Sequence, residues 1–121
     1  MKTLKLFIMF ISICLPVFAS SKILSKNLMP NSIVMGYFYS SNRRNHLLAM
    51  TYVKGVIDGL FATNADLIYR HKIPMFCYHG NVDVYSAMDL DKQYVEEIPK
   101  LKDMDFTTTL LSAYQARYPC K

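Results

Sequence analysis

The sequence predicts an all-α domain, a small bundle of about four to five helices stapled by one disulfide. Three observations support this. Apolar residues recur at three- and four-residue steps through the middle of the chain, which is the spacing of one helix face. Prolines and short polar residues stand where helices would start and stop. No stretch alternates apolar and polar residues for long enough to make a sheet, although the run Thr107-Thr108-Thr109 mildly favours a strand.

Residues 1–19 have the pattern of a secretory signal peptide. Lys2 and Lys5 precede an apolar run over residues 6–18, and Ala19 supplies a small residue for cleavage. The run is shorter than the roughly 18 residues of a membrane-spanning helix. We therefore expect residues 20–121 to form a single helical domain in the periplasm, with no membrane segment after signal cleavage.

Signal cleavage would remove Cys14 and leave two cysteines, Cys77 and Cys120. An even count suits an oxidising compartment, so we predict that they pair. The bridge would close a loop of about 40 residues, for which the chain-entropy model gives a stabilisation of about 4 kcal/mol. Lipidation at Cys14 is a weaker alternative, because the bulky Ile13 precedes it.

The charge pattern argues against nucleic acid as a partner. The formal net charge of +5 falls to about +3 once Lys2 and Lys5 leave with the signal. The remaining basic residues are scattered, with only Arg43-Arg44 adjacent, so no basic stripe follows a phosphate backbone. The four glycines are isolated from one another, so no glycine-rich phosphate loop exists.

In the first half of the domain, the sequence pattern predicts an arm, a short helix and a long helix. The arm covers residues 20–29 and ends at Pro30. Asn31 or Ser32 could cap the short helix, which would run to residue 38 before the polar residues 40–42. With Asn42 as cap, the long helix would run from residue 43 to about residue 63, and its continuation through residue 68 must stop before Pro74.

One face of the long helix carries Tyr52, Gly55 and Gly59, with Asp58 beside them. Each glycine costs about 1 kcal/mol of helix propensity relative to alanine, which favours a close approach there. We prefer another helix of the same domain as the packing partner, and a dimer seam is the alternative. Asp58 would either bond a neighbouring helix end or pair with Lys54.

The second half predicts a loop and two helices. The loop over residues 76–82 contains a turn at Gly80-Asn81. Asp83 would cap the next helix, which Pro99 ends. Residues 100–104 form a charged connection, and either Asp103 or Asp105 opens a last helix that ends at Tyr118.

No catalytic or metal-binding constellation emerges. A cysteine hydrolase would need Cys77 with His71 or His79 as base, but export and the presence of Cys120 favour a disulfide. A zinc site from the same four residues has no standard ligand spacing. Glu96 and Glu97 lie about 100° apart on a helix, so they do not converge on one atom. We expect neither enzymatic activity nor a metal or other cofactor.

The remaining candidate is a surface for recognition. Aromatic residues and arginine anchor protein interfaces, and several lie between residues 69 and 81. The candidate partner-binding residues are Tyr69, Arg70, His71, Tyr78, His79 and Asn81. Because the chain has nine tyrosines, some of these side chains would instead belong to the core.

Three strings in order resemble the Rap/Tai immunity family of type VI secretion systems. They are Tyr52-Val53-Lys54-Gly55-Val56-Ile57-Asp58-Gly59, then Phe76-Cys77, then Tyr118-Pro119-Cys120, and the likeness runs from about Leu47 to Cys120. The family usually has a proline soon after the first cysteine and a Gly-Val-Thr helix start. This chain has Tyr78-His79-Gly80 and Asn81-Val82-Asp83 there, and Pro99 to Asp103 replaces a segment that often contains Arg-His.

The resemblance implies a periplasmic, helical and often dimeric protein without catalytic residues. Such a protein binds a secreted cell-wall-degrading effector, typically a peptidoglycan amidase, and blocks its active site. The alternative hypothesis is a periplasmic stress chaperone or envelope accessory protein. That alternative expects acid to expose apolar surface as carboxylates such as Asp58 and Asp83 become protonated.

Overall fold

The computed structural model describes residues 29–121, so the proposed signal peptide and most of the arm lie outside the described residues. Within that part, four α-helices and one 3₁₀ helix form the domain, and the only β-pairing is an isolated bridge. The elements are α3 (Asn31–Phe38), α4 (Arg43–Tyr69), α5 (Val84–Glu97), η2 (Pro99–Asp103) and α6 (Phe106–Arg117). The all-α prediction is confirmed.

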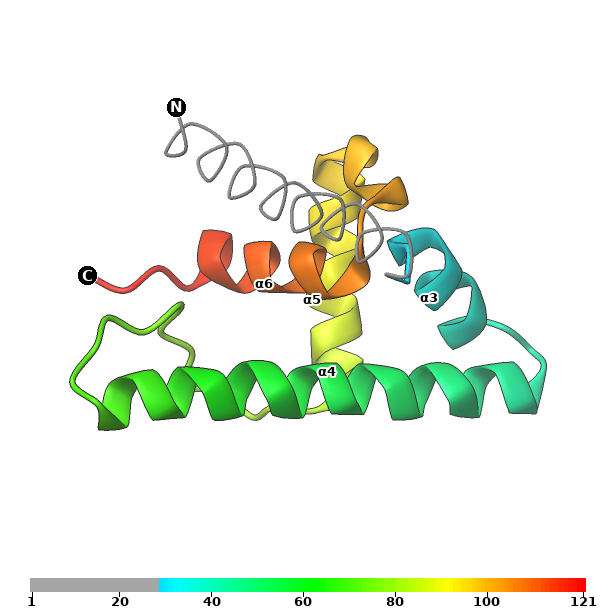
Figure 1. The fold of residues 1–121 in the computed structure, drawn as a ribbon. Coiled ribbons are helices and arrows are strands. Elements are labelled where there is room, and N and C mark those ends of the chain that lie inside the picture. Colours follow the sequence, from blue (N-terminus) through cyan, green and yellow to red (C-terminus); the bar gives the residue numbers. More distant parts are fainter. Residues whose placement is uncertain (1–28) are drawn as a thin grey trace, which may run out of the picture.

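Helix α4 is the base of the fold, and the other helices lie on one side of it (Figure 1). Asn42 caps α4 as predicted, because its side chain accepts hydrogen bonds from the backbone N–H groups of Arg44 and Asn45. The buried residues of α4 recur at the period of a helix and are Ala49, Val53, Ile57, Leu60 and Asn64. The helix continues past residue 63 to Tyr69, since Asn64 extends the buried face by another turn.

The start of α3 differs from the prediction. Pro30 occupies the N-cap position without any side-chain cap, and Asn31 is the first helical residue. Asn31 does not cap the helix because its buried side chain turns inward to Asp91 of α5. The Asn31 N–H instead donates to the Met104 carbonyl at 2.8 Å, which joins the start of α3 to the segment before α6.

Asp83 caps α5 by accepting from the Ser86 N–H, as predicted. Residues 100–104 were expected as a charged connection, and most of them lie in the 3₁₀ helix η2, whose Leu101 is buried. Of the two candidate caps for the last helix, the structure uses Asp105, which accepts from the Thr108 N–H. The threonine run is helical, and buried Thr109 donates its hydroxyl to the Asp105 carbonyl.

The core lies between α4 and the helices stacked on it, and its fully buried side chains include Val53, Phe76, Ala87, Met88, Phe106 and Leu110. The predicted disulfide is present. Cys77 and Cys120 are bonded, with 5.0 Å between their Cα atoms. The Cys77 N–H also donates to the Tyr118 carbonyl at 2.8 Å. The bridge therefore fastens the loop before α5 to the end of α6.

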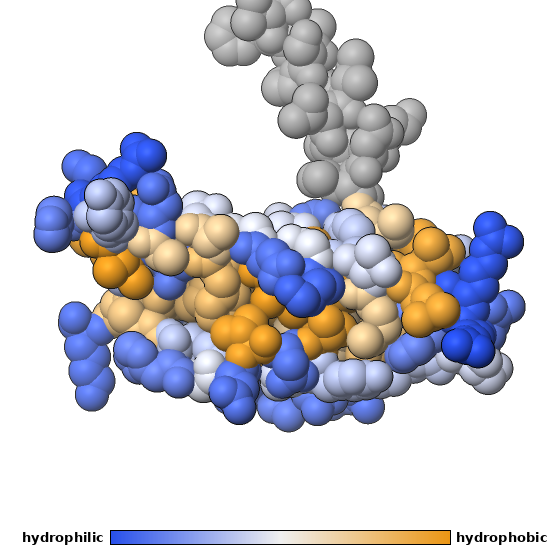
Figure 2. All heavy atoms as spheres, turned by 90° about the horizontal axis from the view of Figure 1, so that it is seen from below, coloured by the Kyte–Doolittle hydropathy of each residue, from blue (hydrophilic) through white to orange (hydrophobic). Residues whose placement is uncertain are grey.

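No helix of residues 29–121 packs on Gly55 and Gly59, where a helix of the same domain was expected. Both glycines are exposed, and a Cβ atom added to either would meet nothing within 4 Å among the described residues. Asp58 pairs with Lys54, which is one of its two expected partners. Figure 2 looks onto the molecule from the side of α4 and shows apolar side chains reaching this surface between polar ones.

Candidate functional site

The end of α4 turns sharply into a loop that we call the tip loop, residues 69–74. The His71 N–H donates to the Ile68 carbonyl at 3.0 Å, and the Lys72 N–H donates to the Leu67 carbonyl at 2.8 Å. This is the hydrogen-bond pattern of a Schellman motif, in which the residue after the C-cap takes a left-handed conformation. His71 occupies that position with φ 55°. The motif holds the tip loop in one defined shape.

Two apolar side chains project from the tip loop into solvent. Tyr69 is 84% exposed and Ile73 is 86% exposed, the highest values among the exposed large apolar residues of the described chain. The basic residues Arg70, His71 and Lys72 stand exposed between them. Arg70 also pairs with Asp66 one helical turn earlier, at 2.9 Å. Large apolar and arginine side chains in this density are typical of a protein-binding surface.

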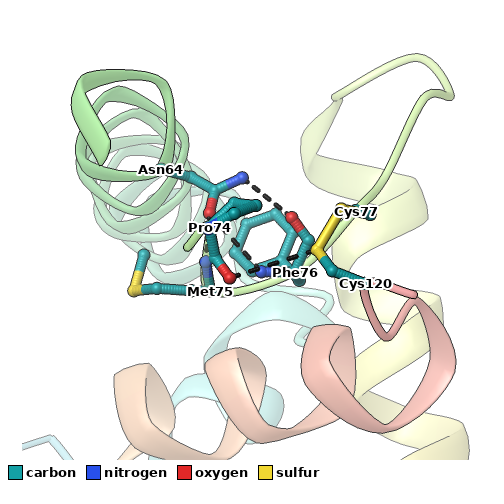
Figure 3. Close-up of a disulfide and its surroundings, with 6 residues drawn as sticks. All are labelled: Asn64, Pro74, Met75, Phe76, Cys77 and Cys120. Atoms are coloured by element: carbon teal, nitrogen blue, oxygen red, sulfur yellow. Dashed lines mark hydrogen bonds between the residues drawn. A yellow bond between two sulfur atoms is a disulfide. The ribbon is translucent and has the colours of Figure 1, made fainter. Parts of the chain in front are cut away.

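The buried side chain of Asn64 fixes the return of the tip loop into the core (Figure 3). Its Oδ1 accepts from the Met75 N–H at 2.7 Å and from the Phe76 N–H at 3.4 Å, and its Nδ2 donates to the Phe76 carbonyl at 3.0 Å. Three backbone groups of the loop therefore find their partners on one side chain of α4. The disulfide at Cys77 follows immediately and closes the other end of the loop.

An aromatic cluster lies beneath this anchor and consists of Phe61, Phe76, Tyr78, Tyr114 and Tyr118. Phe76 stacks on Tyr114 with 5.0 Å between ring centroids, and Tyr78 meets Tyr118 edge-on at 4.6 Å. Burial raises the pKa of Tyr114 to about 12, so its hydroxyl stays neutral. The cluster joins α4, the loop and α6 into one support for the tip loop.

The six candidate binding residues therefore separate into two groups. Tyr69, Arg70 and His71 are exposed together on the tip loop. Tyr78 belongs to the aromatic cluster, and its hydroxyl donates to the Asn81 carbonyl at 2.9 Å. His79 and Asn81 are exposed on that second turn. A Cβ atom at Gly80 would clash with the Tyr78 hydroxyl oxygen, so any other residue there would force the Tyr78 ring to move.

Sequence reasoning missed Ile73 and a groove between α3 and α4. The groove is apolar and is lined by Met29, Ile33, Val34, Tyr37, Leu48, Ala49 and Tyr52. A neighbouring hollow at the start of α4 adds Leu47 beside Arg43 and Arg44. Ile33 and Tyr37 lie four residues apart in α3 and therefore share one face of that helix. This spacing was the sequence signal for the α3 side of the groove.

In residues 29–121, no three His, Cys, Asp or Glu side chains gather in an arrangement that could hold a metal ion. The same part of the chain contains no helix that is both long and apolar enough to span a membrane. A family model described as Rap1a immunity proteins matches residues 35–120. No curated protein and no solved structure is significantly similar to the chain.

Proposed function

The chain belongs to the Rap1a immunity protein family, and we propose that it protects its cell by binding a secreted type VI effector in the periplasm. On this proposal the effector is a cell-wall-degrading peptidoglycan amidase, and the protein covers its active site. On this proposal the chain binds the effector and catalyses no reaction of its own. The export pattern of residues 1–19 and the disulfide support a periplasmic site of action.

The observation that carries the proposal is the tip loop. Its apolar side chains protrude from a rigid end of the molecule, and the active sites of hydrolases are concave. A rigid, convex loop enters such a cleft without a large loss of conformational entropy on binding. Asn64, the Schellman motif and the disulfide all hold the tip loop before any partner arrives.

The conformation of His71 supports the same assignment. Glycine is the usual residue at the left-handed position of a Schellman motif, because any side chain there is strained. This chain carries an exposed imidazole at that position. Side chains kept at a conformational cost are concentrated at binding sites. We assign the His71 side chain to the effector contact.

Replacing Tyr69 and Ile73 together by serine is expected to abolish protection. Both side chains are almost fully exposed and make no core contact, so the thermal unfolding midpoint should stay within about 2 °C of the wild type. Anchor residues of this kind each contribute about 2 kcal/mol or more to binding, so loss of the pair should raise the dissociation constant by roughly 700-fold or more. The measurement is lysis of cells that co-express the cognate amidase in the periplasm, together with calorimetry of the purified pair.

Leu47→Ser is the matched control, because Leu47 is also exposed and apolar but lies at the opposite end of α4. It should protect as well as the wild type. Equal protection by the Tyr69 and Ile73 double variant would remove the tip loop from the interface. Lysis with every variant and with the wild type would reject the immunity function itself.

We also propose that the open face at Gly55 and Gly59 is a seam between two copies of the chain. Alanine at either position raises helix propensity by about 1 kcal/mol and meets no atom within the monomer, so Gly55→Ala should stabilise the monomer. If the α4 helices of two copies cross closely at Gly55, the added methyl group would push these two helices apart. We therefore expect light scattering to show weaker dimerisation for Gly55→Ala despite its higher unfolding midpoint. A variant that dimerises as the wild type does would place the seam elsewhere.

The chaperone alternative gains no support from its two carboxylates. Asp58 is exposed and pairs with Lys54 on the same helix, so its protonation removes only a surface contact. Hydrogen bonds from Ser86 hold the pKa of Asp83 below its ordinary value of 3.8. The stabilisation from Asp83 is therefore present above pH 3.8 and is lost only at lower pH. Asp83 therefore supplies no trigger in mild acid.

A further inference from the structure

We propose that Asn31 and Asp91 form a buried acid–amide pair that holds one proton, and that losing this proton as the pH rises weakens the attachment of α3 to α5. The pair is independent of the tip loop and of the proposed immunity function. It concerns the only buried carboxylate of the described residues, since both side chains are 0% exposed.

Asn31 and Asp91 share one hydrogen bond, and each side chain keeps one buried oxygen without a partner. Asn31 Nδ2 donates to Asp91 Oδ1 at 3.0 Å. Asn31 Oδ1 and Asp91 Oδ2 are both buried, and neither has a hydrogen-bond partner among the described residues. Two acceptor oxygens cannot satisfy one another, and on this proposal a proton on Asp91 Oδ2 is donated to Asn31 Oδ1. The pair then closes a ring of two hydrogen bonds, and the buried negative charge disappears.

The surroundings provide no positive charge to keep Asp91 ionised. Burial raises the pKa of Asp91 from 3.8 to about 6, and only the hydrogen bond from Asn31 opposes this shift. Burial, and then the charges of Asp89, Asp91 and Glu96, raise the pKa of Tyr39 at the C-cap of α3, so its hydroxyl is neutral. The face of α4 turned to the core is apolar apart from Asn64.

The remaining titratable groups near α3 have other contacts or are exposed. Lys92 of α5 is exposed and lies over the Tyr39 ring at 5.4 Å from its centroid. Asp105, which pairs with Pro30 in an isolated bridge, accepts from Thr108 through Oδ2, and its Oδ1 is buried without a hydrogen-bond partner among the described residues. The half-buried His46 ring contacts the Phe38 carbonyl through Nδ1. The exposed charged residues of η2 are Lys100, Lys102 and Asp103.

The direction of the pH effect follows from the sign of the shift. The folded protein binds the Asp91 proton more tightly than the unfolded chain does, because the folded pKa is the higher one. The stabilisation is therefore fully present below pH 3.8 and is lost as the pH rises through about 6. The contact between α3 and α5 is firmest in acid, opposite to the usual behaviour of a paired carboxylate.

The test compares the pH dependence of unfolding in the wild type, in Asp91→Asn and in Asp89→Asn. A second amide at position 91 can both donate to and accept from Asn31 at every pH. Relative to this variant, the unfolding equilibrium constant of the wild type should rise about 30-fold between pH 4.5 and pH 7.5. Asp91→Asn should therefore unfold at higher temperature than the wild type at pH 7.5. Asp89→Asn is the control, because Asp89 is exposed on the same helix, and it should follow the wild type.

A second measurement is made on the wild type alone, so it does not depend on the variants folding. The ¹³C shift of the Asp91 side-chain carboxyl should titrate with a midpoint near pH 6. A midpoint near pH 4 would overturn the proposal. Parallel stability curves for the wild type and Asp91→Asn would also overturn it, because the proton would then contribute nothing to α3.

Discussion

Replacing Cys77 and Cys120 together by serine is expected to lower the free energy of unfolding by about 4 kcal/mol. The bridge closes a loop with a sequence separation of 43 residues, and opening it releases the unfolded chain from that constraint. A domain of this size has a total stability of roughly 5–15 kcal/mol, so the loss removes a large fraction of it. Urea unfolding of the wild type and of the double variant measures the difference directly.

The comparison uses free energies and not midpoints, because an uncrosslinked chain expands on unfolding and changes the denaturant slope. The wild type measured in a strong reductant is the matched control and should coincide with the double variant. The variant should also lose protection against the effector, since Cys77 ends the segment that carries the tip loop. A variant within about 0.5 kcal/mol of the oxidised wild type would show that packing alone holds this end of the fold.

The sequence was most informative where structure depends on neighbouring residues. The caps Asn42 and Asp83 bond backbone groups two or three residues away, so short-range pattern is sufficient to find them. The disulfide was predictable for another reason, because only two cysteines lie outside the proposed signal peptide. The long helix was predictable from the period of its apolar face.

The errors occurred where a distant residue decides the outcome. Asn31 resembles a cap, yet its side chain bonds Asp91, sixty residues away in sequence. The charged connection contains the 3₁₀ helix η2, and its Leu101 is buried by contacts with distant parts of the fold. Gly55 and Gly59 were expected to admit another helix of the same domain, but the described fold leaves their face open. None of these outcomes depends on a local pattern.

In the candidate site, too, features set by neighbouring residues were predicted and features set by distant residues were missed. Tyr69, Arg70 and His71 were expected together in a loop. In the structure Tyr69 is the last residue of α4, Arg70 and His71 follow it, and all three are exposed. Tyr78 was grouped with them, but its ring belongs to a cluster built from α4 and α6, which only the tertiary fold assembles. Asn64 was not singled out. A polar residue in line with Val53, Ile57 and Leu60 on an apolar helix face was a usable sign that it has buried partners.

Replacing Asn64 by leucine is expected to lower the free energy of unfolding by about 3–5 kcal/mol, although the two side chains are similar in size. The change leaves the N–H groups of Met75 and Phe76 and the Phe76 carbonyl without their partner. Each buried group without a partner costs about 1–3 kcal/mol. Urea unfolding measures the total loss, and hydrogen exchange at the Met75 amide shows whether the tip loop opens locally.

Asn64→Asp separates the contributions of the three bonds. An aspartate still accepts from both N–H groups but, when ionised, cannot donate to the Phe76 carbonyl, so its loss should lie between zero and that of leucine. Because Asn64 lies beneath the tip loop and is itself buried, any loss of effector binding in a variant that remains folded must come from misplacement of the loop. Binding should therefore weaken in the same order as the Met75 amide loses protection. Unchanged binding alongside lost protection would mean that the tip loop need not be rigid to act.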